Sequence, residues 1–246
     1  MSLSNRQIKL INSLHSKKGR KENLKFLVEG EKVINELINS NWSIDFIVLN
    51  EKYTLEYQNQ ANIYFLPEES ITKLSSLQTN TFGIAIVEMK KSTENIFSNI
   101  GLTLFLDGIR DPGNLGTIIR ICDWYGIKTI FTSFDSTEFY NPKTIISTMG
   151  SFIRINVVEI SFLELVKNLP KHRIVGTFLE GTSIYEYSFK PNQIIVLGNE
   201  STGIRADIER LVQDQITIPK IGEAESLNVG ISTAIVLDNA IRKLMI

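Results

Sequence analysis

Apolar and polar residues alternate along the first 90 residues with two periods, one typical of strands and one typical of helices. Helical spacing of the apolar positions predicts three helices, within residues 3–15, after Gly30 and after Pro67. A polar loop that contains a glycine is expected over Ser16–Lys21. The expected strands span Phe26–Val28, Ile44–Leu49, Ile63–Leu66 and Gly83–Glu88. Together these elements make a complete small α/β unit.

The remaining chain predicts a parallel sheet. Leu102–Leu106 has the composition of a strand that is buried on both faces. Further apolar segments alternate with helical ones up to a long apolar helix over Val229–Leu244, and this order is typical of a sheet covered by helices on both faces. The further strands are expected over Lys128–Thr132, Ile153–Val158, Arg173–Phe178, Ile194–Leu197 and Ile216–Ile218.

A polar segment separates the two units. Residues 91–101 combine Lys, Ser, Thr, Asn and Gly, a composition typical of a linker. We therefore expect a first domain over residues 1–90 and a second domain over residues 102–246. The 246 residues include 43% hydrophobic and 22% charged residues, an ordinary globular composition with enough length for two cores.

Charge is distributed unevenly, although the net charge is only −1. Residues 1–25 contain seven Lys or Arg and one Glu, so this arm carries +6 and the rest of the chain carries −7. A basic arm of this kind suits a phosphate backbone, whereas a solvated terminal segment without a partner is the alternative that charge alone leaves open. The residues expected to contact that phosphate backbone, if the first interpretation holds, are Lys17, Lys18, Arg20 and Lys21.

Cysteine and histidine usage argues against disulfide and metal chemistry. Cys122 is the only cysteine and lies in an apolar helical stretch, so it is expected in the core. His15 and His172 have no Cys or carboxylate at metal-ligand spacing, and we expect no metal. No apolar run approaches the roughly 20 residues of a membrane span, and the N-terminus lacks the apolar core of a signal peptide. The expected location is therefore the cytoplasm.

Asp107–Arg120 is the first loop with candidate chemistry. It follows a buried strand and opens a helix, so its helix-start amides are available to an anion. An ordinary Pro-Gly turn, with Asn114 capping the helix and Arg120 on its surface, is the alternative. The glycine spacing differs from the dinucleotide fingerprint and the expected acidic residue is missing, which argues against a dinucleotide-dependent enzyme.

Two further loops follow buried strands. In Leu197–Ile204, Asn199 and Glu200 lie between two glycines, which allow close approach of the backbone to a ligand. The loop over residues 219–228 ends in the sequence Ser-Leu-Asn and leads into the last helix. Each loop alone is also explained as a turn or a helix cap. Because ligands usually bind at the carboxyl ends of parallel strands, the three loops together predict a ligand site.

These loops resemble the three ordered motifs of the SpoU/TrmH family, within the SPOUT superfamily. The motifs are Asn114-x-Gly116-x-x-x-Arg120, Gly198-Asn199-Glu200-x-x-Gly203 and Ile218-Pro219-x-x-Gly222-x-x-Glu225-Ser226-Leu227-Asn228-Val229. The resemblance implies an RNA ribose 2′-O-methyltransferase that uses S-adenosyl-L-methionine (AdoMet). It also implies an α/β fold with a C-terminal parallel-sheet SPOUT domain and a deep trefoil knot. Residues 1–90 resemble, more weakly, the small α/β RNA-binding domain of this family.

The functional residues of the family are carried onto this chain through the motifs. The resemblance implies that AdoMet binds mostly to backbone groups of the loops and that the protein is a homodimer. The residues expected to contact the cofactor are Thr177, Gly198, Ile218 and Leu227, with Gly176 as a further candidate. The residues expected around the reacting ribose are Asn114, Arg120, Glu200, Ser226 and Asn228. Arg110 is a further expected RNA contact.

The resemblance assigns Arg120 to the ribose 2′-hydroxyl. Because a guanidinium stays protonated at working pH, we expect Arg120 to bind the adjacent phosphate and to stabilise developing negative charge. Ribosomal RNA is favoured over transfer RNA, since a sizeable first domain suggests recognition of a folded RNA by its shape. A non-catalytic RNA-binding or ribosome-assembly protein on the same fold is the alternative. Gly230 departs from the family, in which Ser is common at that position.

Overall fold

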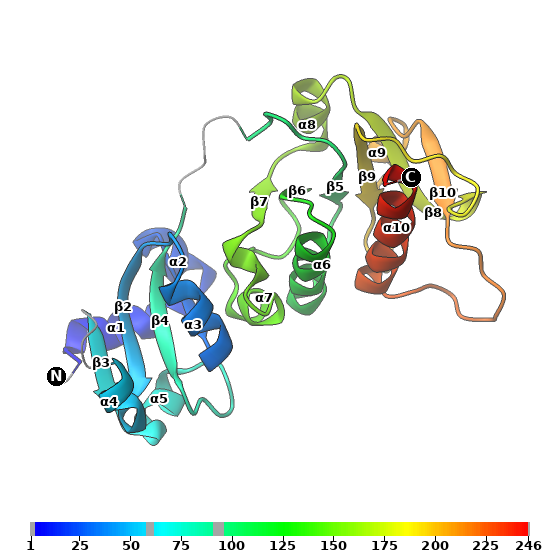
Figure 1. Cartoon of the computed structure of the whole chain (residues 1–246). Coiled ribbons are helices and arrows are strands. Elements are labelled where there is room, and N and C mark those ends of the chain that lie inside the picture. The colour runs from blue at the N-terminus through cyan, green and yellow to red at the C-terminus, as the bar shows by residue number, and fades with distance from the viewer. Residues whose placement is uncertain (1–2, 58–61, 91–95, 246) are drawn as a thin grey trace. The chain divides into compact units, whose positions relative to one another are not determined.

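The computed structural model describes residues 3–57, 62–90 and 96–245 and divides into two compact units. One unit comprises Met1–Ser92 together with Glu138–Ile153, and the other comprises Thr93–Thr137 together with Arg154–Ile246 (Figure 1). Of the expected linker over residues 91–101, residues 91–95 lie outside the described residues.

The first unit is built on a mixed sheet of four strands in the order β1-β4-β2-β3. β4 pairs antiparallel with both β1 and β2, whereas β2 and β3 are parallel. Its strands are β1 (Lys25–Glu29), β2 (Ile44–Asn50), β3 (Ile63–Leu66) and β4 (Gly83–Glu88). Its helices are α1 (Asn5–Leu14), α2 (Lys17–Asn23), α3 (Glu31–Ile38), η1 (Glu51–Tyr53), α4 (Thr54–Tyr57), α5 (Glu68–Leu74), α7 (Pro142–Ser147) and η2 (Ser151–Ile153).

Alternation along β1 explains why both faces of this sheet are covered. Phe26 and Val28 pack in one core with apolar residues of α3 and with Ile145 of α7. Leu27 points to the other face and packs with residues of α1 and α5. Successive side chains of a strand point to opposite faces, so a continuously apolar strand requires helices on both sides.

Ser16–Lys21 is helical, and the expectation of a loop was wrong. Ser16 caps α2, and its side chain accepts a hydrogen bond from the Gly19 amide at 3.0 Å. A Cβ atom on Gly19 would lie 2.0 Å from the Ser13 carbonyl oxygen, so glycine allows α2 to pack closely against the end of α1. The helix was missed because it lacks a periodic apolar face and contains a glycine, two features that lower helix propensity.

The second unit contains a six-stranded sheet in the order β10-β8-β9-β5-β6-β7, and every neighbouring pair is parallel. This confirms the predicted parallel sheet. Leu104 in the centre lies between Ile130 of β6 and Ile195 of β9. The strands are β5 (Thr103–Leu106), β6 (Thr129–Thr132), β7 (Asn156–Glu159), β8 (Arg173–Ser183), β9 (Gln193–Leu197) and β10 (Asp214–Thr217).

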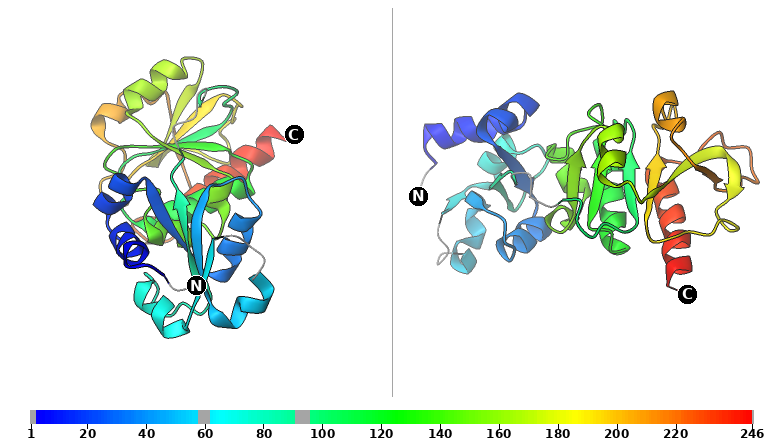
Figure 2. Two further views of the ribbon diagram at one scale, coloured as in Figure 1. Left: turned by 90° about the vertical axis from the view of Figure 1, so that its left-hand side faces the viewer. Right: turned by 90° about the horizontal axis from the view of Figure 1, so that it is seen from above.

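Helices cover both faces of this sheet (Figure 2). Phe105 and Val196 pack with residues of α8 and α9 on one face, whereas α6 and α10 contact each other on the opposite side. Cys122 of α6 is fully buried, as expected. The helices are α6 (Pro112–Trp124), α8 (Phe162–Asn168), α9 (Ala206–Glu209) and α10 (Val229–Leu244). The bounds of α10 agree with those predicted from its apolar pattern.

Three expectations for the second half of the chain were wrong in detail. The segment over residues 184–192 connects β8 to β9 without a helix. β7 begins at Asn156 rather than at Ile153, because Phe152 is buried in the core of the first unit within a short 3₁₀ helix. β8 continues to Ser183, beyond the expected end at Phe178.

No helix in the described part of the chain is long and apolar enough to cross a membrane.

Candidate functional site

Three loops leave the sheet of the second unit at the carboxyl ends of β5, β9 and β10. β5 and β9 are neighbours, and β10 is separated from β9 only by β8. Because all these strands are parallel, the loops emerge at one edge of the sheet. The edge therefore collects the three motifs that are far apart in the sequence.

Hydrogen bonds between three polar side chains, which we call the junction, join the three loops. The Asn114 Nδ2 atom donates to the Glu200 Oε1 atom at 2.5 Å, and the Asn228 Nδ2 atom donates to the Asn114 Oδ1 atom at 2.9 Å. Asn228 also caps α10, since its Oδ1 atom accepts hydrogen bonds from the amides of Gly230 and Ile231. The structure thus brings Asn114, Glu200 and Asn228 together, and it fixes the orientation of both amide groups.

Asp111, rather than Asn114, caps the first motif helix. Its Oδ1 atom accepts a hydrogen bond from the Asn114 amide at 2.8 Å, and Pro112 occupies the first helical turn. The side chain of Asn114 is therefore free of a capping role and turns toward the other two loops. This geometry removes the ordinary-turn explanation that the sequence left open for Asn114.

Arg120 and Ser226 are not part of this junction. Both are exposed, and the side chain of neither makes a hydrogen bond or an ion pair with another described residue. Arg120 lies six residues after Asn114 on α6, about 9 Å along the helix axis. A solvent-facing guanidinium without an internal partner remains available for a phosphate or another anion.

Gly198 lies in a turn that no larger residue fits. A Cβ atom at this position would lie 2.3 Å from the carbonyl carbon of Gly203. Asn199 and Gly203 form two backbone hydrogen bonds across the turn, at 3.1 and 2.9 Å. Gly203 has a φ angle of +68°, in the region that favours glycine. The two glycines hold the backbone on either side of Glu200 in a tight loop.

Replacement of Gly198 with alanine is expected to lower the free energy of unfolding by about 1–3 kcal/mol, because backbone atoms must move to admit the methyl group. Urea denaturation of the two proteins measures this loss. Gly222→Ala is the matched control, since its added Cβ atom would have no neighbour within 4 Å. Equal losses of stability in both variants would contradict the steric explanation.

Thr177 begins an irregular stretch of β8. Gly176 pairs with Gln215 of β10, but the next pair joins Thr182 to Ile216, so residues 177–181 have no partner in β10. The Thr177 hydroxyl donates to the Val196 carbonyl of β9 at 3.0 Å. The sequence placed Thr177 at the end of a strand, whereas the structure places it at a bulge near the middle of a longer one.

The loop over residues 219–227 offers unpaired backbone groups. All nine residues are exposed, and within the described chain none of their N–H or C=O groups makes a hydrogen bond. Ile218 at its start is half-buried, and Leu227 at its end exposes 45% of its surface. Apolar residues beside free peptide groups suit a ligand with an apolar body and several polar atoms, as AdoMet has. The expected cofactor residues therefore fit a group that binds mainly to the backbone.

Asp107 and Arg205 form a polar pair that the sequence analysis missed. Asp107 exposes only 1% of its surface, and the Oδ1 atom of its carboxylate lies 2.6 Å from the Arg205 Nη2 atom. The Oδ2 atom of Asp107 accepts a hydrogen bond from the Arg205 backbone amide at 2.8 Å. Asp107 directly follows β5, and a lone acidic residue after a buried strand is the signal that was available in the sequence.

Asp135 adds a second acidic group beside Arg205, at 3.5 Å. Partial burial opposes ionisation of Asp135, but the hydrogen bond from Ser133 and the charges of Arg205 and Arg110 outweigh it and lower its pKa. Partial burial likewise opposes the charged form of Arg205, but Asp107 and Asp135 raise its pKa overall. Arg205 therefore stays cationic between two carboxylates.

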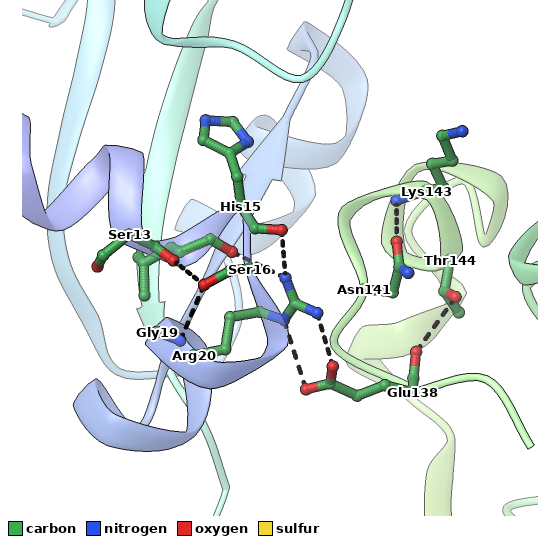
Figure 3. A network of polar contacts seen from close by, with 10 residues as sticks. Ser13, His15, Ser16, Gly19, Arg20, Glu138, Asn141, Lys143 and Thr144 are labelled. Atoms are coloured by element: carbon green, nitrogen blue, oxygen red, sulfur yellow. Dashed lines mark hydrogen bonds and ion pairs between the residues drawn. The ribbon is translucent and has the colours of Figure 1, made fainter. Parts of the chain in front are cut away.

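Arg20 is buried, although it was expected to contact RNA. Its residue exposure is 2%, and its Nη2 atom lies 2.6 Å from the Glu138 Oε2 atom (Figure 3). Its Nη1 atom donates to the carbonyl groups of Leu14 and His15, at 2.9 and 3.0 Å. A buried guanidinium with these partners is not free to bind RNA, so the prediction for Arg20 is corrected. Lys17, Lys18, Lys21 and Arg110 are exposed.

Comparison with known proteins gives matches over both halves of the chain. Residues 101–238, more than half of the sequence, match the family model of the SpoU rRNA Methylase family. Residues 5–85 match the model of an MRM3-like substrate binding domain. The first match includes all three loops at the edge of the parallel sheet.

Individual relatives align over almost the whole chain. A 23S rRNA (guanosine(2553)-2′-O)-methyltransferase, RlmP of Bacillus subtilis, is 28% identical over 96% of both chains. A TrmH-family protein of known structure from Porphyromonas gingivalis is 32% identical, with a TM-score of 0.86 over 99% of this chain and 100% of its own. An AdoMet-bound rRNA methyltransferase from Sinorhizobium meliloti is 28% identical, with a TM-score of 0.85 over 99% and 97%. The chain belongs to the SpoU rRNA methylase family.

Proposed function

We propose that this protein transfers a methyl group from AdoMet to a ribose 2′-hydroxyl of ribosomal RNA. The junction of Glu200, Asn114 and Asn228 at the edge of the parallel sheet is the observation that carries the proposal. The name of the B. subtilis relative, which covers 96% of this chain, supports the reaction and the class of RNA. The non-catalytic alternative is not favoured, because the named relatives are methyltransferases.

AdoMet is the cofactor, and when bound it supplies a methyl group activated by a positively charged sulfur. Gly198 brings the backbone of the second loop close to the site, and Ile218 and Leu227 flank the unpaired peptide groups of the third loop. Thr177 borders the same region from the bulge in β8. We assign these four residues to cofactor binding, and the AdoMet-bound relative from S. meliloti supports the assignment of the ligand.

The polar side chains are assigned to the ribose and its phosphate. Each of the amides of Asn114 and Asn228 uses part of its hydrogen-bonding capacity within the junction, and the remaining donors and acceptors are available to ribose hydroxyls. Arg120 holds the adjacent phosphate and stabilises negative charge on the 2′ oxygen as its proton leaves. Ser226, which has no partner within the described chain, orients the substrate or the cofactor.

The first unit is assigned to recognition of folded RNA. Its match to a substrate binding domain and the exposed lysines of α2 support this role. The lysines contribute sequence-independent contacts with phosphates, so binding is expected to weaken as salt concentration rises. A ribosomal RNA substrate is consistent with the cytoplasmic location expected from the sequence.

Incubation of the purified protein with radiolabelled AdoMet tests the proposal directly. Ribosomal RNA and transfer RNA, each prepared without its own modification, are offered separately, and nucleoside analysis locates the label. Label on a ribose of ribosomal RNA supports the proposal. Label only in transfer RNA would overturn the substrate class, and AdoMet binding without transfer to free RNA or ribosomal particles would overturn the reaction.

We infer that two copies associate through the outer faces of α6 and α10. On α6, Trp124 is 85% exposed, and it lies one turn after Arg120. Met245, after the end of α10, is 83% exposed and lines the same hollow as Trp124, together with Tyr125 and Ile241. Apolar surface of this kind marks interfaces, and a second copy placed here would lie beside Arg120.

Replacement of Trp124 with aspartate is expected to convert a dimer into a monomer, because a charge would be buried at the centre of the interface. Size-exclusion chromatography with light scattering measures the mass. Leu55→Asp, which alters an equally exposed apolar residue of α4, is the control and should leave the mass unchanged. A wild-type protein that is monomeric at micromolar concentration would contradict the inference.

A deep knot in the C-terminal segment belongs to the same proposal. β10 pairs with β8 at the edge of the sheet, and the chain then returns through residues 219–228 so that α10 contacts α6. This return across the sheet supports the knotted path that the resemblance implies.

A further inference from the structure

The loop that carries Glu200 is attached to the first motif at both of its ends. At its start, the Asn199 Nδ2 atom donates to the Gly108 carbonyl at 2.6 Å. At its end, the backbone and guanidinium of Arg205 both bind the carboxylate of Asp107. Glu200 lies between these attachments, where its own carboxylate accepts the Asn114 hydrogen bond. The second loop is therefore positioned against the first by three contacts.

Asp107 provides a rigid anchor for the far end of this loop. It is buried at the carboxyl end of the central strand β5, and no other described residue makes a hydrogen bond to its Oδ1 atom. The free-energy cost of burying the charge of Asp107 is consequently offset mainly by Arg205. The next two residues are also held, because the amides of Gly108 and Ile109 donate to Ser133 and Ser136, at 2.8 and 3.1 Å. A buried charge with one cationic partner couples the position of that partner tightly to the sheet.

Other charged groups near Arg205 do not replace Asp107. Asp135 lies 3.5 Å from the Arg205 Nη1 atom but is itself half-exposed, and Asp207 contributes only a longer-range charge. The positive charge of Arg110, in the first loop, acts on Asp135. Only Asp107 contacts both the backbone and the side chain of Arg205, so it is the group that fixes where the loop ends.

We propose that the ion pair between Asp107 and Arg205 is a positioning pair for methyl transfer, which holds Glu200 and, through Glu200, the amide of Asn114 in place. This role rests on the proposed function. Neither residue needs to touch the substrate, since a small displacement of a group at the reacting centre is enough to slow a reaction by about 100-fold. The pair is expected to affect turnover more than the affinity for either substrate.

Arg205→Ala and Arg205→Lys test the proposal in the full-length protein. Hydrogen–deuterium exchange over residues 198–205, without RNA, reports the mobility of the loop independently of activity. Steady-state kinetics report kcat and KM, with AdoMet and the unmodified form of the RNA that the wild-type protein methylates as substrates. Arg173→Ala is the matched control, because Arg173 also pairs with an aspartate, Asp214, but at the amino ends of β8 and β10. Asp107→Asn tests the other partner with an uncharged side chain of the same shape.

In Arg205→Ala we expect faster exchange over residues 198–205 and a kcat lowered about 10- to 100-fold, with the KM for AdoMet changed less than threefold. Arg205→Lys should recover part of kcat, and Arg173→Ala should change neither quantity. Unchanged exchange in Arg205→Ala would overturn the proposal. Faster exchange with unchanged kcat would overturn the role in catalysis.

Failure of the proposed function has a different signature. If the wild-type protein methylates no RNA, the exchange measurement still decides whether the pair holds the loop. Faster exchange in Arg205→Ala and Asp107→Asn, with none in Arg173→Ala, would then support the attachment while the assignment of the reaction fails.

Discussion

Replacement of Arg120 with alanine is expected to lower the rate of methyl transfer by about 10²- to 10³-fold, with the affinity for AdoMet changed less than twofold. Loss of one preorganised group that stabilises developing charge costs about this much in other enzymes. Arg120 is exposed on α6 and has no partner within the described chain, so its removal leaves no internal charge unpaired. The stability of the variant should therefore remain within about 0.5 kcal/mol of the wild type. Single-turnover kinetics and AdoMet titration measure the two effects separately.

Arg120→Lys distinguishes a role of the positive charge from a role of the planar guanidinium group. Lysine keeps the positive charge but lacks the planar pair of donors that binds a phosphate at two points, so we expect most of the activity to be lost. Arg210→Ala, an exposed arginine at the end of α9, is the control. Retention of most activity in Arg120→Lys, with a pH–rate profile like that of the wild type, would contradict a specific role for the guanidinium.

Replacement of Arg20 with alanine is expected to lower the free energy of unfolding by about 3–5 kcal/mol, because it leaves a buried carboxylate without its partner. Glu138 is 12% exposed in its side chain, and Arg20 provides its ion pair at 2.6 Å. The variant also removes the donors to two carbonyl groups at the end of α1 (Figure 3). Denaturant unfolding, followed by a probe in the first unit, measures the loss.

Lys17→Ala is the matched control for Arg20, because both residues belong to the basic segment and only Lys17 is exposed. We expect Lys17→Ala to leave stability within about 0.5 kcal/mol, to weaken RNA binding and to reduce its salt dependence. The double variant Arg20→Met, Glu138→Met should be more stable than Arg20→Met alone, since no charge is then left unpaired. Weaker RNA binding by Arg20→Ala with unchanged stability would restore Arg20 to the RNA-binding surface.

The contrast between Lys17 and Arg20 explains which predictions could be made from the sequence. Both residues belong to a run of like charge, and nothing local distinguishes them. Arg20 differs because Glu138, more than 100 residues away, lies against it in the same compact unit. The sequence gives the number of charges in a segment, but the partner of each charge depends on tertiary contacts.

The strands show the opposite case. β4 and α10 have the bounds that their apolar patterns predict, and the strands of the second unit were placed within about three residues, except that β8 continues five residues further than expected. Period and composition suffice there because burial on both faces requires a continuous apolar run. The errors fall where long-range packing overrides the pattern, as at Phe152, which is buried with β1 of the first unit rather than extended as part of β7.

The sequence by itself determined the order of the strands, the parallel sheet and the three polar loops at strand ends, because each is encoded in residues that are neighbours in the chain. Only the tertiary structure decided that Asn114 bonds to Glu200 and Asn228, that Arg20 is buried, and that Asp107 anchors Arg205. These pairs join residues about 90 to 120 positions apart. Their geometry follows from the packing of the sheet, which no local pattern specifies.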